Sequence, residues 1–308
     1  MRIVLTLALP VLVILASTGC SPSGSNSANA TSDSPDSITF GRPSADLAKL
    51  PKVTPGQAIP REYIDSGDVE AVRYFLDGGA DINAEVDMGI SALMIAIAMS
   101  ANGVTDLLLE RGADVNLGSK EGETPLISCA ITNKLPLAKR LVSLGADVNA
   151  ESKHGRNAIG VVAHMGNDAW VTYLLDNGVD VDAANKNGET ALHAACAQGR
   201  TNTVQLLLER GASADQPDKL NRAPLIEAAH KGSAECVKLL LASGVDLNRV
   251  TKAYQETPLI TATQNQRTEV VKLLIAHGAD KSAKDNHGRT ALDHAERKND
   301  PELVGLLE

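Results

Sequence analysis

The sequence has few aromatic residues and no excess of basic ones. Phe, Trp and Tyr make up 2% of its 308 residues, whereas Ala, Leu, Val and Gly are abundant. Strands favour aromatic and β-branched side chains, so this composition argues against a β-sandwich and favours a helical bundle or solenoid. The formal net charge is −9. Because a nucleic-acid partner would need a basic face, we expect no nucleic-acid binding.

Motifs typical of catalysis and of metal binding are missing as well. The chain contains no Cys-x-x-Cys, no His-Glu-x-x-His, no Gly-x-Ser-x-Gly and no phosphate-binding Gly-x-x-x-x-Gly-Lys. Each of these motifs places a nucleophile, a metal ligand or a phosphate cradle at a spacing that its chemistry requires. We therefore expect a protein that is not an enzyme and that holds neither a cofactor nor a metal ion.

The one long apolar run lies at the N-terminus, from Ile3 to Ala16, and follows the basic residue Arg2. It is too short to cross a bilayer as a helix, which takes about 20 residues. Its length and its basic start are typical of a signal peptide, so we expect residues 1–19 to be one.

The run is followed by Ser17-Thr18-Gly19-Cys20, which resembles the lipobox of bacterial lipoproteins. The resemblance implies that the peptide is cut before Cys20, that the Cys20 thiol is acylated, and that the lipid holds the protein to a membrane. Ser17 departs from the pattern, in which Leu is usual. The alternative is an ordinary secretory peptide cut nearby, with the protein secreted or soluble in the periplasm.

Residues 20–57 are expected to be a flexible, lipid-attached linker. From Ser21 to Ser37 the chain is rich in Ser, Asn, Ala and Asp and has almost no apolar side chains. Such a segment cannot bury enough surface to offset its chain entropy. Because Ser21 rather than Asp follows the cysteine, the lipoprotein resemblance implies the outer membrane, with the protein facing the periplasm.

A repeat of 33 residues fills the rest of the chain. Its first landmark is a Gly-Ala-Asp-like tripeptide whose copies are spaced by 33 residues five times and by 34 once, starting at Gly79, Gly112, Gly145, Gly178, Gly211, Gly244 and Gly278. A second landmark keeps this step, starting at Ser91, Thr124, Asn157, Thr190, Ala223, Thr257 and Thr290. Two landmarks in one register indicate a repeat architecture.

Each unit is predicted to contain two short helices and a polar loop. The Ser, Thr or Asn at the second landmark can cap the first helix, whereas Ala223 should cap poorly. Leu-rich stretches such as Leu206-Leu207-Leu208 predict the second helix, which the glycine of the tripeptide ends in a left-handed conformation. Asn221 stands where the other loops have glycine. This replacement is tolerable because Asn accepts a positive φ better than most residues.

This pattern resembles the ankyrin repeat in its period, its Thr-Pro-Leu-like helix start, its Leu-rich second helix and its Gly-Ala-Asp close. The resemblance covers residues 58–308, or about eight units. It implies an all-α ankyrin-repeat solenoid of helix–turn–helix units with finger loops on one side, and a non-catalytic protein–protein interaction scaffold. The loop between Asn248 and Thr257 is one residue longer than the others and holds Tyr254.

The remaining cysteines, His193 and Trp170 are expected to be structural. Cys129, Cys196 and Cys236 take the places of small apolar residues in the helices, and a free cysteine packs like a small hydrophobe. A bond between Cys196 and Cys236, which lie in neighbouring units, stays open. His193 holds the helix-start position of the ankyrin repeat, where its ring bonds within the turn, and Trp170 is expected to pack between repeats.

The candidate protein-binding residues lie on the fingers and at the ends of the first helices. These places face the concave side of an ankyrin stack, and here several of them hold apolar or adaptable side chains. The candidates are Met88, Ile90, Met99, Ile131, His154, His164, Met165 and Tyr254. The alternative is that some of them belong to the core. A lysine also recurs every 33 residues along the fingers, at Lys120, Lys153, Lys186 and Lys219. These lysines either form a solvated surface or contact an acidic partner.

Together these features predict a monomeric scaffold that binds another protein in the bacterial cell envelope. Two other functions stay open. One is an effector or immunity protein that inhibits a specific protein target. The other is an accessory protein that stabilises a periplasmic enzyme.

Overall fold

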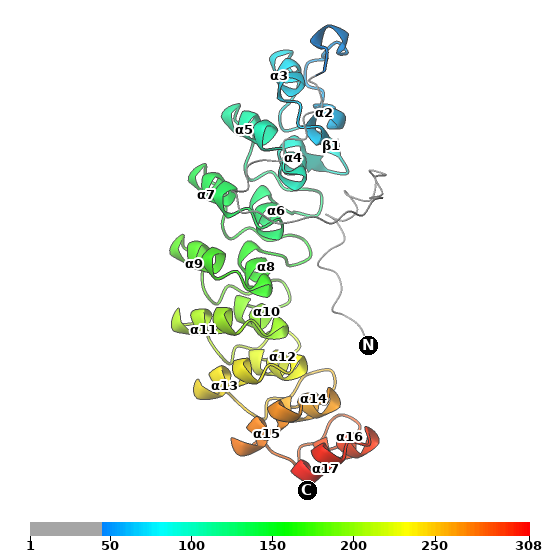
Figure 1. The fold of residues 1–308 in the computed structure, drawn as a ribbon, viewed down its shortest axis with the longest axis vertical. Helices are drawn as coiled ribbons and strands as arrows, with labels where there is room; N and C mark the ends of the chain where they lie inside the picture. The colour runs from blue at the N-terminus through cyan, green and yellow to red at the C-terminus, as the bar shows by residue number, and fades with distance from the viewer. Residues whose placement is uncertain (1–44) are drawn as a thin grey trace, which may run out of the picture.

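The computed structural model describes residues 45–308, which form a stack of eight helix pairs (Figure 1). A 3-10 helix, η1 (Leu47–Lys49), precedes the stack. The pairs are α2 (Arg61–Asp65) with α3 (Val69–Asp77), α4 (Ala92–Met99) with α5 (Asn102–Glu110), α6 (Pro125–Ile131) with α7 (Leu135–Ser143), α8 (Ala158–Met165) with α9 (Asp168–Asp176), α10 (Ala191–Gln198) with α11 (Thr201–Glu209), α12 (Pro224–Lys231) with α13 (Ala234–Ala242), α14 (Pro258–Gln264) with α15 (Thr268–Ala276), and α16 (Ala291–Arg297) with α17 (Pro301–Leu307).

In most repeats the first helix begins where the sequence predicts because a side chain caps it. The hydroxyl of Thr124 accepts a hydrogen bond from the amide of Ile127 at 3.3 Å. Asn157 accepts one from the amide of Gly160 in the same way, at 2.9 Å. Each bond satisfies an amide that has no partner inside the helix. Ala223 provides no side-chain cap, as predicted.

The glycine after each second helix has the predicted left-handed backbone. Its φ lies between 75° and 92° at Gly79, Gly112, Gly145, Gly178, Gly211, Gly244 and Gly278. Asn221 takes the place of its finger's glycine at a φ of 60°, which confirms the prediction for that residue. In the longer finger the corresponding position is Gln255, whose φ is 54°; this exchange was not predicted.

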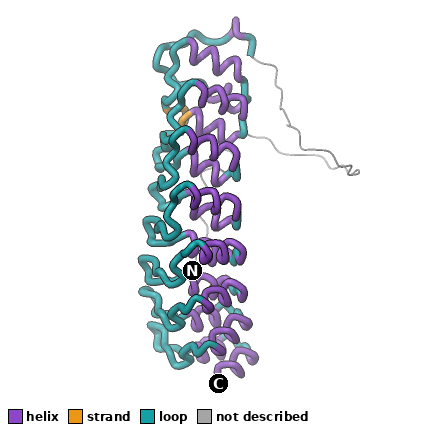
Figure 2. The backbone as a smooth tube through the Cα atoms, turned by 90° about the vertical axis from the view of Figure 1, so that its left-hand side faces the viewer, coloured by secondary structure: helices purple, strands orange, loops and turns teal. Residues whose placement is uncertain are grey.

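The first helices form one row and the second helices form another, and both rows run the length of the stack (Figure 1). In one row α8 packs against α10 and α10 against α12, and in the other α11 packs against α13. Figure 2 shows that the finger loops all project from one edge of the stack. The structure therefore confirms the predicted all-α solenoid with finger loops.

A continuous apolar core fills the space between the rows. Trp170 and Phe75 are among its largest fully buried side chains. Cys129, Cys196 and Cys236 are buried and free, so no bond joins Cys196 to Cys236 in this structure. Burial raises the pKa of Cys129 to about 12. A thiol of that kind stays protonated and packs as a small apolar group, which confirms the predicted role.

The segment 45–57, which we expected to be part of the linker, instead packs against the first unit. Leu50 and Val53 contact the core, and a Cβ on Gly78 would come within 2.6 Å of the Val53 side chain. The Gly56 amide donates to the Gly79 carbonyl at 2.8 Å. These apolar side chains cover the open end of the repeat, which the composition of residues 21–37 did not indicate. The predicted signal peptide, Cys20 and the rest of the linker lie outside the described residues.

Within the described residues, the first finger contains the one sheet, which has two strands. Strand β1 (Glu85–Asp87) pairs with β2 (Ile90–Ser91) in antiparallel register. Met88 and Gly89 join the strands with φ values of 45° and 80°. Two positive φ values in succession suit a tight hairpin, because they match the right-handed twist of the strands.

Candidate protein-binding surface

Most fingers are closed by the same backbone hydrogen bond. The first residue of such a finger donates to the carbonyl four residues later at 2.9 Å, for example Asn185 to Glu189 and Asp218 to Arg222. The long finger is closed by a bond from Thr251 to Glu256 at 3.1 Å, and the first finger by the pairing of β1 with β2. In the fingers that begin at Asn185 and Asp218, the side chain of the first residue also accepts amide hydrogens from inside the loop, so that the Asp218 carboxylate binds the amides of Leu220 and Arg222 at 2.8 Å each. The finger tips therefore have a defined shape.

Neighbouring fingers are joined by hydrogen bonds, most of them between backbones; side chains of Glu85 and Glu151 make the links to Lys120 and Lys186. The amide of Lys153 donates to the carbonyl of Glu121 at 2.7 Å, and that of Lys219 to the carbonyl of Asn187 at 2.9 Å. The amides of Lys252 and Asn286 continue the pattern towards the C-terminus at 2.9 Å, with the carbonyls of Leu220 and Tyr254 as acceptors. The edge seen in Figure 2 is thus one connected surface.

A row of alternating charges underlies this edge. The residue just before each helix cap is, from the third unit on, Glu123, Arg156, Glu189, Arg222, Glu256 and Arg289. Arg156 forms an ion pair with Glu123, and Arg222 forms one with Glu189 at 3.1 Å. This row was not predicted, although its alternation at the repeat step is visible in the sequence. These two ion pairs each join one unit to the next.

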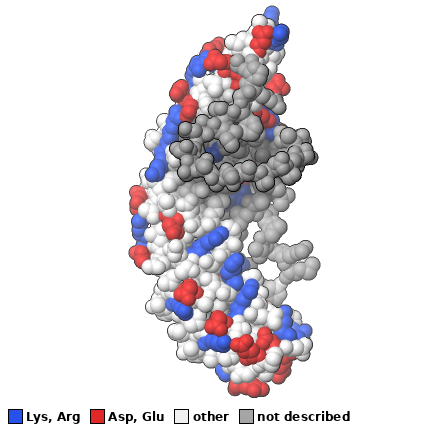
Figure 3. All heavy atoms as spheres, in the orientation of Figure 1, with Lys and Arg blue, Asp and Glu red and all other residues white. Residues whose placement is uncertain are grey.

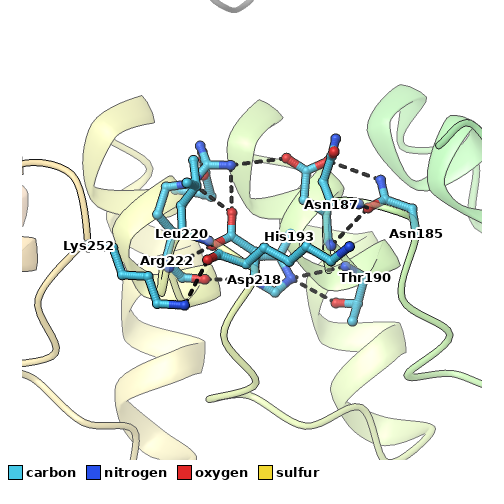
Figure 4. A network of polar contacts seen from close by, with 11 residues as sticks. Asn185, Asn187, Thr190, His193, Asp218, Leu220, Arg222 and Lys252 are labelled. Carbon is cyan, nitrogen blue, oxygen red and sulfur yellow. Dashed lines mark hydrogen bonds and ion pairs between the residues drawn. The ribbon is translucent and has the colours of Figure 1, made fainter. Parts of the chain in front are cut away.

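Arg222 lies at the centre of a polar cluster shown in Figure 4. Its guanidinium contacts Asp218 at 2.6 Å, Glu227 at 2.9 Å and Glu189 at 3.1 Å. Burial raises the pKa of Glu227, with Glu189 and Asp218 acting in the same direction and Arg222 against it. One arginine thus holds three carboxylates, and its loss would leave them facing one another.

His193 joins the same cluster from the start of α10 (Figure 4). The Thr190 amide donates to Nδ1 of His193 at 3.1 Å, so Nε2 carries the proton and donates to the Arg222 carbonyl at 3.0 Å. Burial lowers the pKa of His193, which agrees with this neutral form. The predicted bond within the turn is confirmed, and His193 also connects two units.

A second buried cluster lies between the last two units. The Asp285 carboxylate accepts the amides of His287 and Arg289 at 2.8 and 2.9 Å, and Nε2 of His294 lies 2.9 Å from it. Burial by itself would raise the pKa of Asp285, but these hydrogen bonds hold it well below its usual range. The cluster fixes the last finger against α16.

Basic side chains follow the turns between the two helices of a unit. Arg200 donates from Nε to the carbonyl of His164 at 3.0 Å, and Arg267 does the same to His230 at 3.2 Å. They satisfy carbonyls at the C-terminal end of the preceding unit's first helix, where a cation is favourable. Figure 3 shows basic side chains in an oblique line over the middle of one face, and both signs of charge at the C-terminal end.

The eight candidate binding residues do not gather into one apolar patch. Met88 and Met165 are 57% and 40% exposed, but Met99 and Ile131 are half-buried and pack against the core. Ile90 is also half-buried, in the first finger. The three exposed methionine and tyrosine side chains therefore lie on separate units, with Tyr254 on the long finger at 55% exposure.

The two candidate histidines have polar surroundings. His154 is exposed on its finger and lies 3.0 Å from Glu121 of the preceding finger. His164 is half-buried at the end of α8, where burial lowers its pKa, assisted by Arg200 and Lys231. The His154 ring and the backbone carbonyl of His164 thus each contact a residue of a neighbouring unit.

Residues 45–308 contain no cluster of His, Cys, Asp and Glu that could hold a metal ion. In the same part of the chain no helix is long and apolar enough to cross a membrane.

The helix pairs, the caps and the fingers are those of one family. The model of ankyrin repeats in three copies matches residues 62–152, 129–220, 159–251 and 225–308. The chain therefore belongs to the ankyrin-repeat proteins, which in general are non-catalytic scaffolds that bind other proteins. No curated protein matches the chain.

Proposed function

We propose that this ankyrin-repeat scaffold binds a protein partner while a lipid on Cys20 tethers it in the bacterial cell envelope. The observation that supports binding is the connected edge of eight stacked units, in which hydrogen bonds hold each finger and join it to the next. A surface ordered in advance loses little conformational entropy when a partner binds.

The sequence before the stack supports the tether. Ser17-Thr18-Gly19-Cys20 has the form of a lipobox, and residues 21–44 separate Cys20 from Ala45, whose amide donates to the Asp68 carboxylate. At about 3.5 Å per residue this spacer would extend at most about 85 Å. A monomer on such a spacer in the outer membrane, facing the periplasm, could search a wide zone near the membrane surface.

Metabolic labelling tests the tether. Cells expressing the full chain are grown with labelled palmitate, and the label on the protein and its membrane fraction are measured. We expect a labelled protein in the membrane fraction, and an unlabelled, released protein for Cys20→Ser. Wild-type protein that is soluble and carries no label would contradict the lipid tether.

Crosslinking in native membranes identifies the partner. Capture of a structural envelope protein would support a scaffold role. A toxin would instead support an inhibitor, and a periplasmic enzyme would support an accessory role. The matched control is the Cys20→Ser chain, which should lose a membrane-localised partner while keeping its fold.

A further inference from the structure

Three of the seven large apolar side chains exposed in residues 45–308 lie on two neighbouring fingers. Leu220 is 50% exposed, Val250 is 41% exposed and Tyr254 is 55% exposed. The two fingers touch, because the Lys252 amide donates to the Leu220 carbonyl at 2.9 Å and the Asn221 side chain donates to the Val250 carbonyl at 2.7 Å. Contiguous exposed apolar surface usually marks an interaction site.

The backbone under these side chains is held from both sides. The carbonyl of Tyr254 accepts the amide of Asn286 at 2.9 Å, and that of Ala253 accepts the Asn286 side chain at 3.2 Å. On the other finger, the buried Asp218 binds the Leu220 amide and the Arg222 guanidinium (Figure 4). An exposed aromatic side chain on a backbone held in this way is a typical anchor of a protein interface.

The exposed charge around this apolar surface is positive. In the finger tips 185–189, 218–222 and 251–256 the exposed charged residues are all lysines: Lys186, Lys219 and Lys252. The carboxylates of the same tips are engaged, since Asp218 and Glu189 bind Arg222 and Glu256 accepts the Gln264 side chain at 2.9 Å. Lys186 and Lys219 have no ion-pair partner among the described residues.

We infer that these six residues, which we name the lysine edge, bind an acidic protein segment that carries an aromatic or aliphatic anchor. The lysine edge consists of Lys186, Lys219, Lys252, Leu220, Val250 and Tyr254. The anchor packs on the three apolar side chains, while carboxylates on either side meet the lysines. This inference rests on the proposed function as a protein-binding scaffold and specifies the chemistry of its partner.

The chain's own N-terminal segment has similar chemistry but does not reach this edge. Asp33 and Asp36 precede Ile38 and Phe40. Phe40 lies five residues before Ala45, or at most about 18 Å away, and Ala45 is bound to the first unit. The lysine edge lies on the fifth to seventh units, and packed helices are about 10 Å apart, so the distance is about 50 Å. The occupant is therefore a different molecule.

Selection from a random peptide library displayed on phage tests the inference. The full-length protein is immobilised and the enriched 16-residue peptides are sequenced (a length of about 50 Å when extended). Their affinities are then measured by fluorescence anisotropy at low and high salt. We expect net-negative peptides with at least one Leu, Phe, Tyr or Trp, whose binding weakens with salt because exposed charges are screened.

Two variants locate the site. In Tyr254→Ser we expect peptide binding to weaken about tenfold or more, as for a buried aromatic anchor. In Lys186→Gln/Lys219→Gln/Lys252→Gln we expect weaker binding and a loss of most of the salt dependence. The matched control is Lys139→Gln/Lys238→Gln/Lys272→Gln, which removes the same charge from the second helices and should bind like the wild type.

Melting curves of all variants are expected to show an intact fold, because every substituted residue is exposed except Lys272, which is half-buried. Enriched peptides that are basic or neutral overturn the inference, as do peptides that bind both edge variants as tightly as the wild type. A library without any enriched peptide overturns it as well. In each case the scaffold proposal is judged separately, by the partner captured in native membranes.

Discussion

Single residues at the helix ends show how strictly the repeat controls its backbone. Gly145 has a φ of 92°, and no atom outside its immediate neighbours lies within 4 Å of where a Cβ would stand. A side chain there would be strained by the backbone alone, without a clash. We therefore expect Gly145→Val to reduce the free energy of unfolding by about 2 kcal/mol, measured by urea denaturation.

The neighbouring Leu144 provides the control for this substitution. It is 50% exposed and its φ is −91°, so Leu144→Val introduces valine at a neighbouring position where the backbone does not strain it. We expect a change within about 0.5 kcal/mol. Equal losses for the two variants would show that the left-handed conformation is not the cause.

Asp285 links a single carboxylate to the pH dependence of stability. Its pKa is lower in the folded chain than the ordinary value of about 3.9, so the ionised form stabilises the fold above about pH 4. This contribution is lost as the pH falls from about 4 towards the folded-state pKa. We expect Asp285→Asn to lower the melting temperature by a few degrees at pH 7, and by less and less below pH 4.

The exposed Asp280 serves as the control, because its turn lies near Asp285 but outside the cluster. Asp280→Asn should change the melting temperature less at pH 7. A difference between Asp285→Asn and the wild type that is the same at pH 3 and pH 7 would contradict the role given to the carboxylate.

At the scale of elements, the fingers depend on the charges beneath them. Arg222 contacts Asp218, Glu189 and Glu227. We expect Arg222→Met to reduce the free energy of unfolding by about 3 kcal/mol, the lower end of the range for a buried pair, because the arginine is partly exposed. Adding Glu227→Gln should restore part of the loss, by removing one of the repelling carboxylates.

A double-mutant cycle on Arg222 and Glu227 measures this coupling. Additive losses would mean that Glu227 does not interact with the arginine in solution. The pair Lys238 and Glu235, exposed on α13, is the control and should show a coupling of about 0.5 kcal/mol at most.

The same comparison of elements shows what the sequence could predict. The caps, the left-handed glycines and the row of fingers follow from local residue chemistry repeated every 33 positions, so Thr124, Gly145 and Asn221 were placed correctly. The site depends instead on exposure and on contacts between units. Met99 and Ile131 pack against the core, and this could not be separated from an exposed position by spacing alone. Leu220 and Val250 have no local motif, and only the stacking of two fingers brings them beside Tyr254.

At the scale of the whole molecule, the stack is stable only if both of its ends are covered. A solenoid unit contacts its neighbours alone, so an uncovered terminal unit exposes its apolar face. The segment 45–57 covers the first unit, with Leu50 and Val53 against the core and the Gln57 carbonyl bound to the Asp81 amide at 2.9 Å. The packed part of the chain therefore begins before residue 58, and the proposed lipid tether would join it N-terminal to Leu50.

Two truncations test this end of the molecule. A chain that begins at residue 45 should melt at the same temperature as mature full-length protein, because it keeps Leu50, Val53 and the backbone hydrogen bonds of residues 56 and 57. A chain that begins at residue 58 loses the half-buried Leu50 and Val53, so we expect its free energy of unfolding to fall by about 2 kcal/mol. The loss should appear first as hydrogen exchange at the amides of α3, since the free end of a stack opens before its middle. Val53→Ser in the longer chain should reproduce most of the effect. If instead both truncated chains melt together and α3 stays protected in each, the first unit needs no cover and the solenoid begins near residue 58.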